Sequence, residues 1–317
     1  MGILFMENRE NTVMKVFPAL GTVNSIWAEG GSCKEAASEA EEYIRTVHDR
    51  LSVFNDTSEI SEINRRAGET ACKVSPVTAS LIERSIRYSK DTGGAFDITM
   101  GTGIEWKSTI KTGRLPKPDE IGKIKELTGY KDILVDEEKS TVMLKKKGQK
   151  LDMGGLAKGY AADKTRNILK KHGVKKALLN FGGTIVSIGH MSNIGLQDPF
   201  SETGKIFAVI SLNGKAAVSS GIYEQYIVRG GKRYHHIIDP KTGCPSDTDL
   251  AGVTLVGDSA EMMDAYATAI IILGLEKGLK FVNSKNMEAV FITVDRKVFV
   301  TEEIRKLIKI GGDNYGR

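Results

Sequence analysis

The chain has 317 residues, enough to bury a substantial core as one large domain or two lobes. Its 40% hydrophobic and 27% charged residues are typical of a globular protein, and a net charge of +5 is too mild to indicate nucleic acid as a partner. Three distant cysteines, Cys33, Cys72 and Cys244, indicate neither a disulfide framework nor a zinc site.

In the first half of the chain, strand and helix patterns alternate. Residues 22–29 read as a strand, and residues 34–54 as an amphipathic helix whose apolar side chains, Ile44, Val47, Leu51 and Phe54, recur every three or four positions. Ser75 followed by Pro76 predicts a helix start, and this helix runs to about Lys90. Residues 104–150 look irregular at first and then resemble a hairpin at 132–147.

In the second half, a short strand is expected at 150–153, followed by a helix with a Gly-rich entry that ends before Gly173. Strands follow at 176–190, 206–214, 223–238 and 251–257, with a hairpin turn at Gly230–Gly231. Residues 258–274 read as a helix, with Asp258 and Glu261 at capping-box spacing. A last hairpin covers 288–304.

Hairpins outnumber strand–helix–strand crossovers, which favours an α+β fold with mostly antiparallel sheets over a doubly wound one. No Pro/Ser-rich linker interrupts the chain. We therefore expect a single domain over residues 14–310, built as two lobes without a clear linker, and flexible tails at 1–13 and 311–317.

The sequence contains no apolar run near the ~18 residues of a membrane-spanning helix. Its first residues show neither a signal-peptide pattern nor a lipid-acceptor cysteine. As the chain is written we expect a cytoplasmic protein. The alternative is an exported, membrane-anchored lipoprotein whose leader is missing from this chain.

One candidate site lies at the Gly-rich helix entry "LDMGGLAKGYAADK". Gly154 and Gly155 allow close backbone approach, the helix start offers unpaired N–H groups, and Lys158 adds a positive charge, which together suit a phosphate. The stretch is neither a P-loop nor a G-x-G-x-x-G motif. The alternative is a tight turn that packs a helix on a sheet.

A second candidate site is the pair Asp264 and Thr268, four residues apart on one face of a predicted helix. A carboxylate beside a hydroxyl suits a hard cation such as Mg²⁺. The alternative is a polar pair that is satisfied locally.

A third is His235–His236 at a strand end, where successive side chains point to opposite faces. One of them is expected to point into a pocket. Zinc is disfavoured because no Cys/His cluster accompanies the pair, and packing at a hairpin end is the alternative to catalysis.

Several other strand ends carry glycine pairs or small hydroxyl side chains near polar groups. They are "GGAFD" at 93–97, "NFGGTI" at 180–185 and "AVSSGIYEQY" at 217–226. Each alone is an ordinary turn. Together they predict a cleft for an extended, phosphate-bearing ligand.

These stretches occur in the order expected of a known family. "GGAFD", "LDMGGLAKGYAAD", "NFGGTIVSIG", "AVSSGIYEQY", "YHHIIDPKTGCP" and "DAYATA" make the chain resemble the ApbE family, the FAD:protein FMN transferases, from about Phe17 to Ile304. The resemblance implies a two-lobed α+β fold with FAD in the cleft. It implies Mg²⁺-dependent transfer of FMN from FAD to a Thr or Ser hydroxyl of an acceptor flavoprotein, a redox-pump or reductase subunit, with release of AMP.

The resemblance also implies roles for individual residues. Asp264, Thr268 and the backbone carbonyl of Ala157 match the metal ligands. His236 matches the essential histidine, which leaves His235 for packing or the surface. Either His236 or Asp264 is the candidate for the base that takes the proton of the acceptor hydroxyl. The remaining expected cofactor contacts are Leu20, Ala95, Phe96, Asp97, Lys158 and Asp163.

The chain departs from the family at Leu20, where Met is commoner, and at Thr184, where an acid or amide is usual. Residues 98–108 also diverge from the Pro-Leu stretch that usually follows the Phe-Asp motif in the family. Two other functions stay open: an FAD pyrophosphatase that uses water as acceptor, and a flavin-binding protein without turnover.

Overall fold

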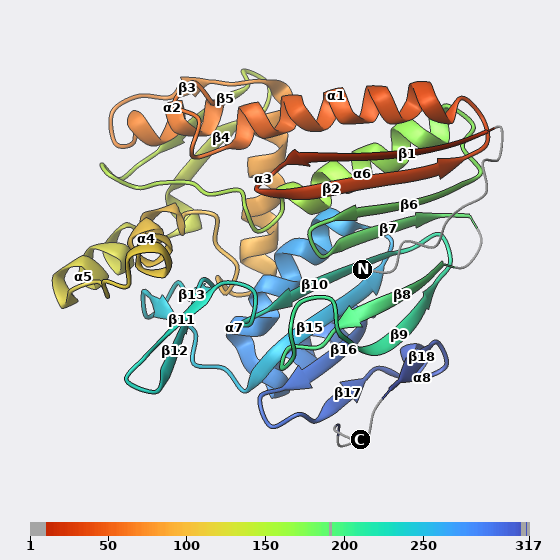
Figure 1. Ribbon diagram of the computed structural model, residues 1–317. Helices are drawn as coiled ribbons and strands as arrows, with labels where there is room; N and C mark the ends of the chain where they lie inside the picture. The colour runs from red at the N-terminus through yellow and green to blue at the C-terminus, as the bar shows by residue number, and fades with distance from the viewer. Residues whose placement is uncertain (1–10, 190–191, 312–314, 316–317) are drawn as a thin grey trace.

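The computed structural model describes residues 11–189, 192–311 and 315. Its main element is an eight-stranded sheet in the order β1-β2-β6-β7-β10-β15-β16-β17, in which all neighbours pair antiparallel (Figure 1). The strands are β1 (Thr12–Ala19), β2 (Thr22–Glu29), β6 (Lys176–Phe181), β7 (Thr184–Ile188), β10 (Ala216–Gly221), β15 (Leu250–Gly257), β16 (Glu288–Thr293) and β17 (Val298–Val300). The α+β class predicted from the sequence is confirmed.

Each face of this sheet buries its own core, because side chains alternate along a strand. One core joins the sheet to the helices α1 (Cys33–Leu51), α6 (Ala157–Lys171) and α7 (Ala260–Ser284). The other joins it to a three-stranded sheet, β18-β9-β8, formed by β8 (Ser192–Gln197), β9 (Ile206–Leu212) and β18 (Ile308–Ile310).

Most of the remaining elements lie at the edges of this framework, whereas α3 (Pro76–Asp91) packs against α7 and contributes side chains to the first core (Figure 1). The helices are α2 (Glu59–Arg65), α3 (Pro76–Asp91), α4 (Ile104–Thr112), α5 (Pro118–Leu127) and α8 (Glu302–Arg305), with 3₁₀ turns at Gly101–Gly103 and Tyr130–Asp132. The strands are β3 (Cys72–Lys73), β4 (Ile133–Asp136), β5 (Thr141–Leu144), β11 (Tyr226–Arg229), β12 (Lys232–His235), β13 (Ile238–Asp239) and β14 (Cys244–Pro245).

Two regions differ from the prediction. The stretch expected to be irregular contains α4 and α5. Helix α5 begins at Pro118 and carries Asp119 and Glu120 in its first turn, where their negative charges interact favourably with the helix dipole and stabilise the helix. The strand expected at 150–153 is absent, and Lys150 forms only an isolated bridge with Met100. The predicted hairpin is confirmed as β4–β5.

Three helix ends also differ. Helix α1 ends at Leu51 because Ser52 turns to extended backbone, so Phe54 lies outside the helix with 73% of its surface exposed. The N-cap of α7 is Ser259, not Asp258, since the Ser259 hydroxyl accepts the N–H of Met262. The helix expected to end near Gly274 breaks there at φ +76° and then resumes to Ser284.

Both predicted tails contain residues with defined contacts. Thr12 already belongs to β1, and the Tyr315 ring packs 5.3 Å from that of Phe207, although both residues fall within the predicted tails. Residues 1–10, 312–314, 316 and 317 of those tails lie outside the described residues. The single-domain boundaries stay a prediction. Within the described ranges no helix is both long and apolar enough to cross a membrane.

Candidate functional site

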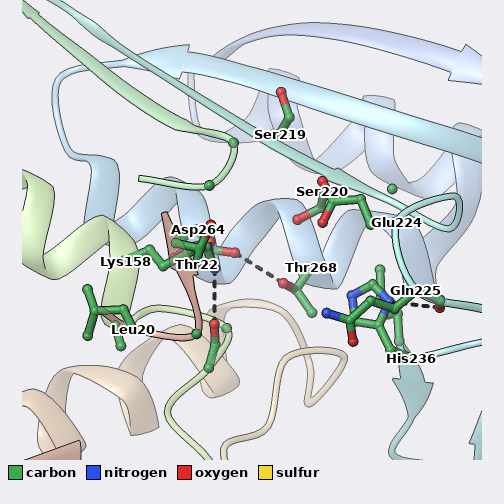
Figure 2. Close-up of a pocket in the computed structure, with 18 of the residues that line it drawn as sticks. Leu20, Thr22, Lys158, Ser219, Ser220, Glu224, Gln225, His236, Asp264 and Thr268 are labelled. Atoms are coloured by element: carbon green, nitrogen blue, oxygen red, sulfur yellow. Dashed lines mark hydrogen bonds and ion pairs between the residues drawn. The ribbon is translucent and has the colours of Figure 1, made fainter. Parts of the chain in front are cut away.

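A cavity of about 1830 Å³ lies where α6 and α7 meet the ends of the central strands. Ligand pockets are commonly ~300–1,000 Å³, so this one has room for a dinucleotide and more. Its walls include all but one of the predicted site residues: Leu20, Ala95, Phe96, Asp97, Ala157, Lys158, His236, Asp264 and Thr268. Figure 2 shows that Asp264 and Lys158 lie together, with His236 and Gln225 further along the cavity.

Asp264 and Thr268 lie one turn apart on α7 and share the cavity face. The Asp264 carboxylate is 4% exposed; its Oδ2 accepts the Gly159 N–H at 3.0 Å, and its Oδ1 lies 3.6 Å from Lys158 Nζ. The Thr268 hydroxyl donates to the Asp264 carbonyl at 3.2 Å. The pair is therefore held by the backbones of two helices.

The start of α6 supplies the facing atoms. Ala157 is its first residue, and the Lys158 ammonium donates to the Gly154 carbonyl at 3.2 Å. Gly159 is where α6 crosses α7: a Cβ there would lie 2.3 Å from the Ala260 carbonyl oxygen. The missing side chain allows the backbone N–H of Gly159 to reach Asp264.

These donors fit a hard cation. A carboxylate, a hydroxyl and a backbone carbonyl from Asp264, Thr268 and Ala157 are oxygen ligands, which Mg²⁺ prefers while it keeps waters or phosphate oxygens for its other positions. The described part of the chain contains no cluster of three His, Cys, Asp or Glu side chains that could hold a metal. A metal here would therefore be held by one carboxylate, Asp264, together with neutral oxygen donors and the substrate.

The two histidines at the end of β12 point to different surroundings. His235 is 4% exposed and its Nε2 lies 3.0 Å from the Ser246 carbonyl; burial lowers its pKa below the ordinary value. His236 is only partly buried and lines the cavity, with Nδ1 3.3 Å from the Gln225 carbonyl. The structure thus places His235 in packing and His236 at the cavity.

Glu224 is a cavity residue for which no role was predicted from the sequence. It follows β10 in the stretch "AVSSGIYEQY", and its side chain is open to the cavity. Burial between the cavity walls raises the pKa of Glu224; Lys158 lowers it and the Asp264 carboxylate raises it further. The available sequence signal was an acid that follows the small hydroxyl residues Ser219 and Ser220.

The turn between β1 and β2 brings Leu20 to the cavity in a strained conformation. Leu20 has φ +54°, a region that residues with a side chain rarely adopt, and its N–H donates to His48 Nδ1 at 3.3 Å. Such strain is often found at functional sites. Phe54, whose spacing predicted a place in a helix, is an exposed aromatic residue in the wall of the same cavity.

Residues 95–97 line the cavity but are largely buried. Phe96 is 3% exposed, and the Asp97 carboxylate is occupied by the N–H and hydroxyl of Thr99 and the N–H of Tyr130, at 2.7–2.8 Å. Burial nevertheless raises the pKa of Asp97. Asp97 therefore holds its own loop against the segment at Tyr130.

Asp163 is the predicted residue that the structure does not bring to the cavity. Its carboxylate accepts the N–H groups of Ala260 and Glu261 at 3.1 Å and pairs with Arg166 at 2.8 Å. Free N–H groups at a helix start attract such a carboxylate. Asp163 thus fixes the start of α7, the helix that carries Asp264.

An antiparallel α+β framework around a dinucleotide-sized cavity, with a carboxylate–hydroxyl pair on one wall and a histidine on another, is the arrangement of a group-transfer enzyme. The chain belongs to the ApbE family, whose family model matches residues 20–291. This confirms the resemblance seen in the sequence.

Individual relatives agree. The chain is 32% identical over 271 residues to the FAD:protein FMN transferase of Klebsiella pneumoniae (strain 342), covering 85% of each chain. It is 30% identical to the enzyme of the same name from Treponema pallidum (strain Nichols), covering 82% of this chain and 77% of that one.

Solved structures share the fold. The ApbE protein from Thermotoga maritima matches with a TM-score of 0.85 and 29% identity, over 93% of this chain and 99% of that one. The flavin transferase ApbE from Vibrio cholerae matches with a TM-score of 0.81 at 22% identity, over 93% and 99%, and supports the fold alone.

Proposed function

We propose that this chain transfers the FMN part of FAD to a Thr or Ser hydroxyl of an acceptor flavoprotein and releases AMP. The observation that carries the proposal is one large cavity in which the Asp264–Thr268 pair and His236 both line the walls. Its volume of about 1830 Å³ leaves room for a dinucleotide and for a loop of a second protein. The acceptor is of the redox-pump or reductase type that the family resemblance implies.

The reaction is a displacement at phosphorus. The acceptor hydroxyl oxygen forms a bond to the FMN phosphorus, the bond from that phosphorus to the bridging oxygen breaks, and the electron pair leaves with AMP. The hydroxyl proton must pass to a base during this step.

His236 is the better base of the two candidates. The Gln225 carbonyl can only accept, so Nδ1 carries the proton and Nε2 is the basic nitrogen of the neutral ring. Both oxygens of Asp264 are already engaged, by the Gly159 N–H and by the Lys158 ammonium. Asp264 is therefore better suited to hold a cation than to take a proton.

Mg²⁺ would be held by Asp264, Thr268 and the Ala157 carbonyl. When bound, it supplies charge neutralisation for the pyrophosphate. Lys158 adds a positive charge beside that position, and the Gly182–Gly183 turn, whose φ values are +57° and +88°, lets the backbone approach the ligand closely. The exposed ring of Phe54 offers a flat surface for flavin or adenine.

The test is incubation of the protein with FAD, Mg²⁺ and a candidate redox subunit, followed by in-gel flavin fluorescence and AMP measurement. We expect a fluorescent acceptor band and equimolar AMP, both lost in Asp264→Asn, which also loses Mn²⁺ affinity in calorimetry while keeping its melting temperature. Free FMN with an unlabelled acceptor would instead assign FAD hydrolysis. Full activity of Asp264→Asn after EDTA treatment would refute the metal site.

A further inference from the structure

The two-stranded ribbon β11–β12 leads directly into His236 and has an unusual charge pattern. Between residues 226 and 235 it carries three cations, Arg229, Lys232 and Arg233, and no Asp or Glu. Polar surfaces usually mix both signs, so a run of one sign beside a cavity indicates a binding partner of opposite charge.

The register of the ribbon separates its side chains into two faces. Val228 lies opposite Arg233, and Ile227 opposite Tyr234. Because side chains alternate along a strand, Tyr226, Val228 and Arg233 share one face with His235, which is buried. The surface formed by Tyr226, Val228 and Arg233 is called here the ribbon face. Arg229, Lys232 and Tyr234 share the other.

The second face is anchored to α4 and the turn that follows it. The Tyr234 ring stacks on Trp106, with centroids 5.9 Å apart and planes at 14°. Arg229 donates to the Gly113 carbonyl at 2.8 Å. An isolated two-stranded ribbon is marginally stable, and these contacts hold this one in place.

The ribbon face itself is open. Tyr226 is 40% exposed and Val228 61% exposed, and the Arg233 guanidinium stacks on the Tyr226 ring, 4.3 Å from its centroid. Tyr226 and Arg233 both line the cavity, as does His236. The stacking holds the Arg233 charge in a fixed position beside an apolar surface at the cavity wall.

We propose that the ribbon face docks a segment of the acceptor protein that carries acidic and apolar side chains next to the hydroxyl that receives FMN. This proposal rests on the proposed function, because a hydroxyl delivered to His236 must bring the chain on either side of it past the cavity wall. Val228 and Tyr226 would contact an apolar residue and Arg233 a carboxylate. The other lysine or arginine among the described cavity residues, Lys158, is engaged with Asp264.

The experiment uses two fluorescein-labelled peptides that each contain one Thr, flanked by Asp and Leu in the first and by Lys and Leu in the second. Binding is measured by fluorescence anisotropy at low salt for the wild type, Arg233→Glu and Lys232→Glu. The Lys232→Glu control makes the same charge change one residue away, on the anchored face. The same samples are then assayed with FAD and Mg²⁺ for peptide-bound FMN.

We expect the wild type and Lys232→Glu to prefer the acidic peptide. Arg233→Glu should lose about threefold to fivefold in affinity for that peptide, the size that one exposed ion pair supports, and gain affinity for the basic one. Flavin fluorescence should show unchanged FAD affinity. Binding without FMN transfer would still support docking and would count against the proposed function alone.

Three results would overturn the docking proposal. Equal losses of peptide affinity in both variants would mean that net charge alone matters. A loss of FAD affinity in Arg233→Glu would place Arg233 at the nucleotide. No peptide preference, together with binding of phosphatidylserine and phosphatidylcholine vesicles through Arg233, would assign the face to a membrane surface.

Discussion

Replacement of Gly159 by Ala tests how the cation site is built. At this crossing of α6 and α7, the new Cβ would lie 2.3 Å from the Ala260 carbonyl oxygen and 2.8 Å from the Glu261 Cα. Ordinary contact begins near 3.4 Å, so the helices must separate by about 1 Å. The 3.0 Å hydrogen bond from Gly159 to Asp264 would lengthen beyond bonding distance.

The size of the effect follows from three terms. Overpacking costs about 1–3 kcal/mol, and loss of a hydrogen bond to a charged group costs about 1.5–3 kcal/mol. Ala recovers about 1 kcal/mol of helix propensity. The net loss is about 1.5–5 kcal/mol, and for 317 residues with ~2.1 cal/mol/K each it lowers Tm by roughly 2–8 °C.

The assay compares Gly159→Ala with Gly122→Ala, the same change in α5 at a position with no neighbour within 4 Å. We expect Gly122→Ala to raise Tm slightly. Gly159→Ala should lower Tm and weaken Mn²⁺ binding, measured by calorimetry. A Gly159→Ala protein with wild-type Tm and wild-type Mn²⁺ affinity would show that the crossing does not position Asp264.

Three further outcomes are expected. His236→Ala should reduce turnover by at least ~100-fold at unchanged Tm. His235→Ala should keep turnover and lower Tm, because it empties a buried position and leaves the Ser246 carbonyl without its hydrogen-bond partner. The reverse ranking would contradict the assignment. Burial lowers the pKa of His235, so below its ordinary value of 6.5 the unfolded chain binds a proton that the folded chain does not, and stability falls as the pH drops; His235→Gln should flatten the pH dependence of unfolding free energy between pH 7 and 5. Asp163→Ala should cost about 1–2 kcal/mol of stability without changing FAD affinity, and a collapse of FAD binding at normal Tm would place Asp163 at the cofactor instead.

Periodicity was enough to predict most of the sheet and the main helices, because their buried faces repeat regularly. The buried positions Ile44, Val47 and Leu51 mark α1 correctly. Phe54 continues the same spacing yet lies outside the helix, since the spacing cannot show where the backbone turns away. Helix α5 carried usable start signals at Pro118 and Glu120, but its short apolar pattern was weak.

The candidate site was predictable to the level of motifs. Sequence alone could not tell which acid faces the cavity and which satisfies backbone N–H groups. Asp264 and Asp163 both lie near the α6–α7 contact, but one lines the cavity and the other fixes a helix start. Asp97 lines the cavity and also holds its own loop. That distinction depends on how the helices cross, which is set by long-range packing.

The charges on the cavity walls would favour a bound cation during the proposed reaction. The Asp264 carboxylate is close enough to raise the pKa of Glu224, and the Lys158 ammonium lowers it. The same ammonium lies 3.6 Å from Asp264 Oδ1. With both carboxylates ionised, these three groups sum to a net negative charge, and the pyrophosphate of FAD brings two more negative charges into a partly enclosed space. One lysine cannot offset that repulsion in a site where burial already raises the pKa of Glu224. A divalent ion at Asp264 and Thr268 reverses the balance, so FAD and the metal should each bind more tightly in the presence of the other.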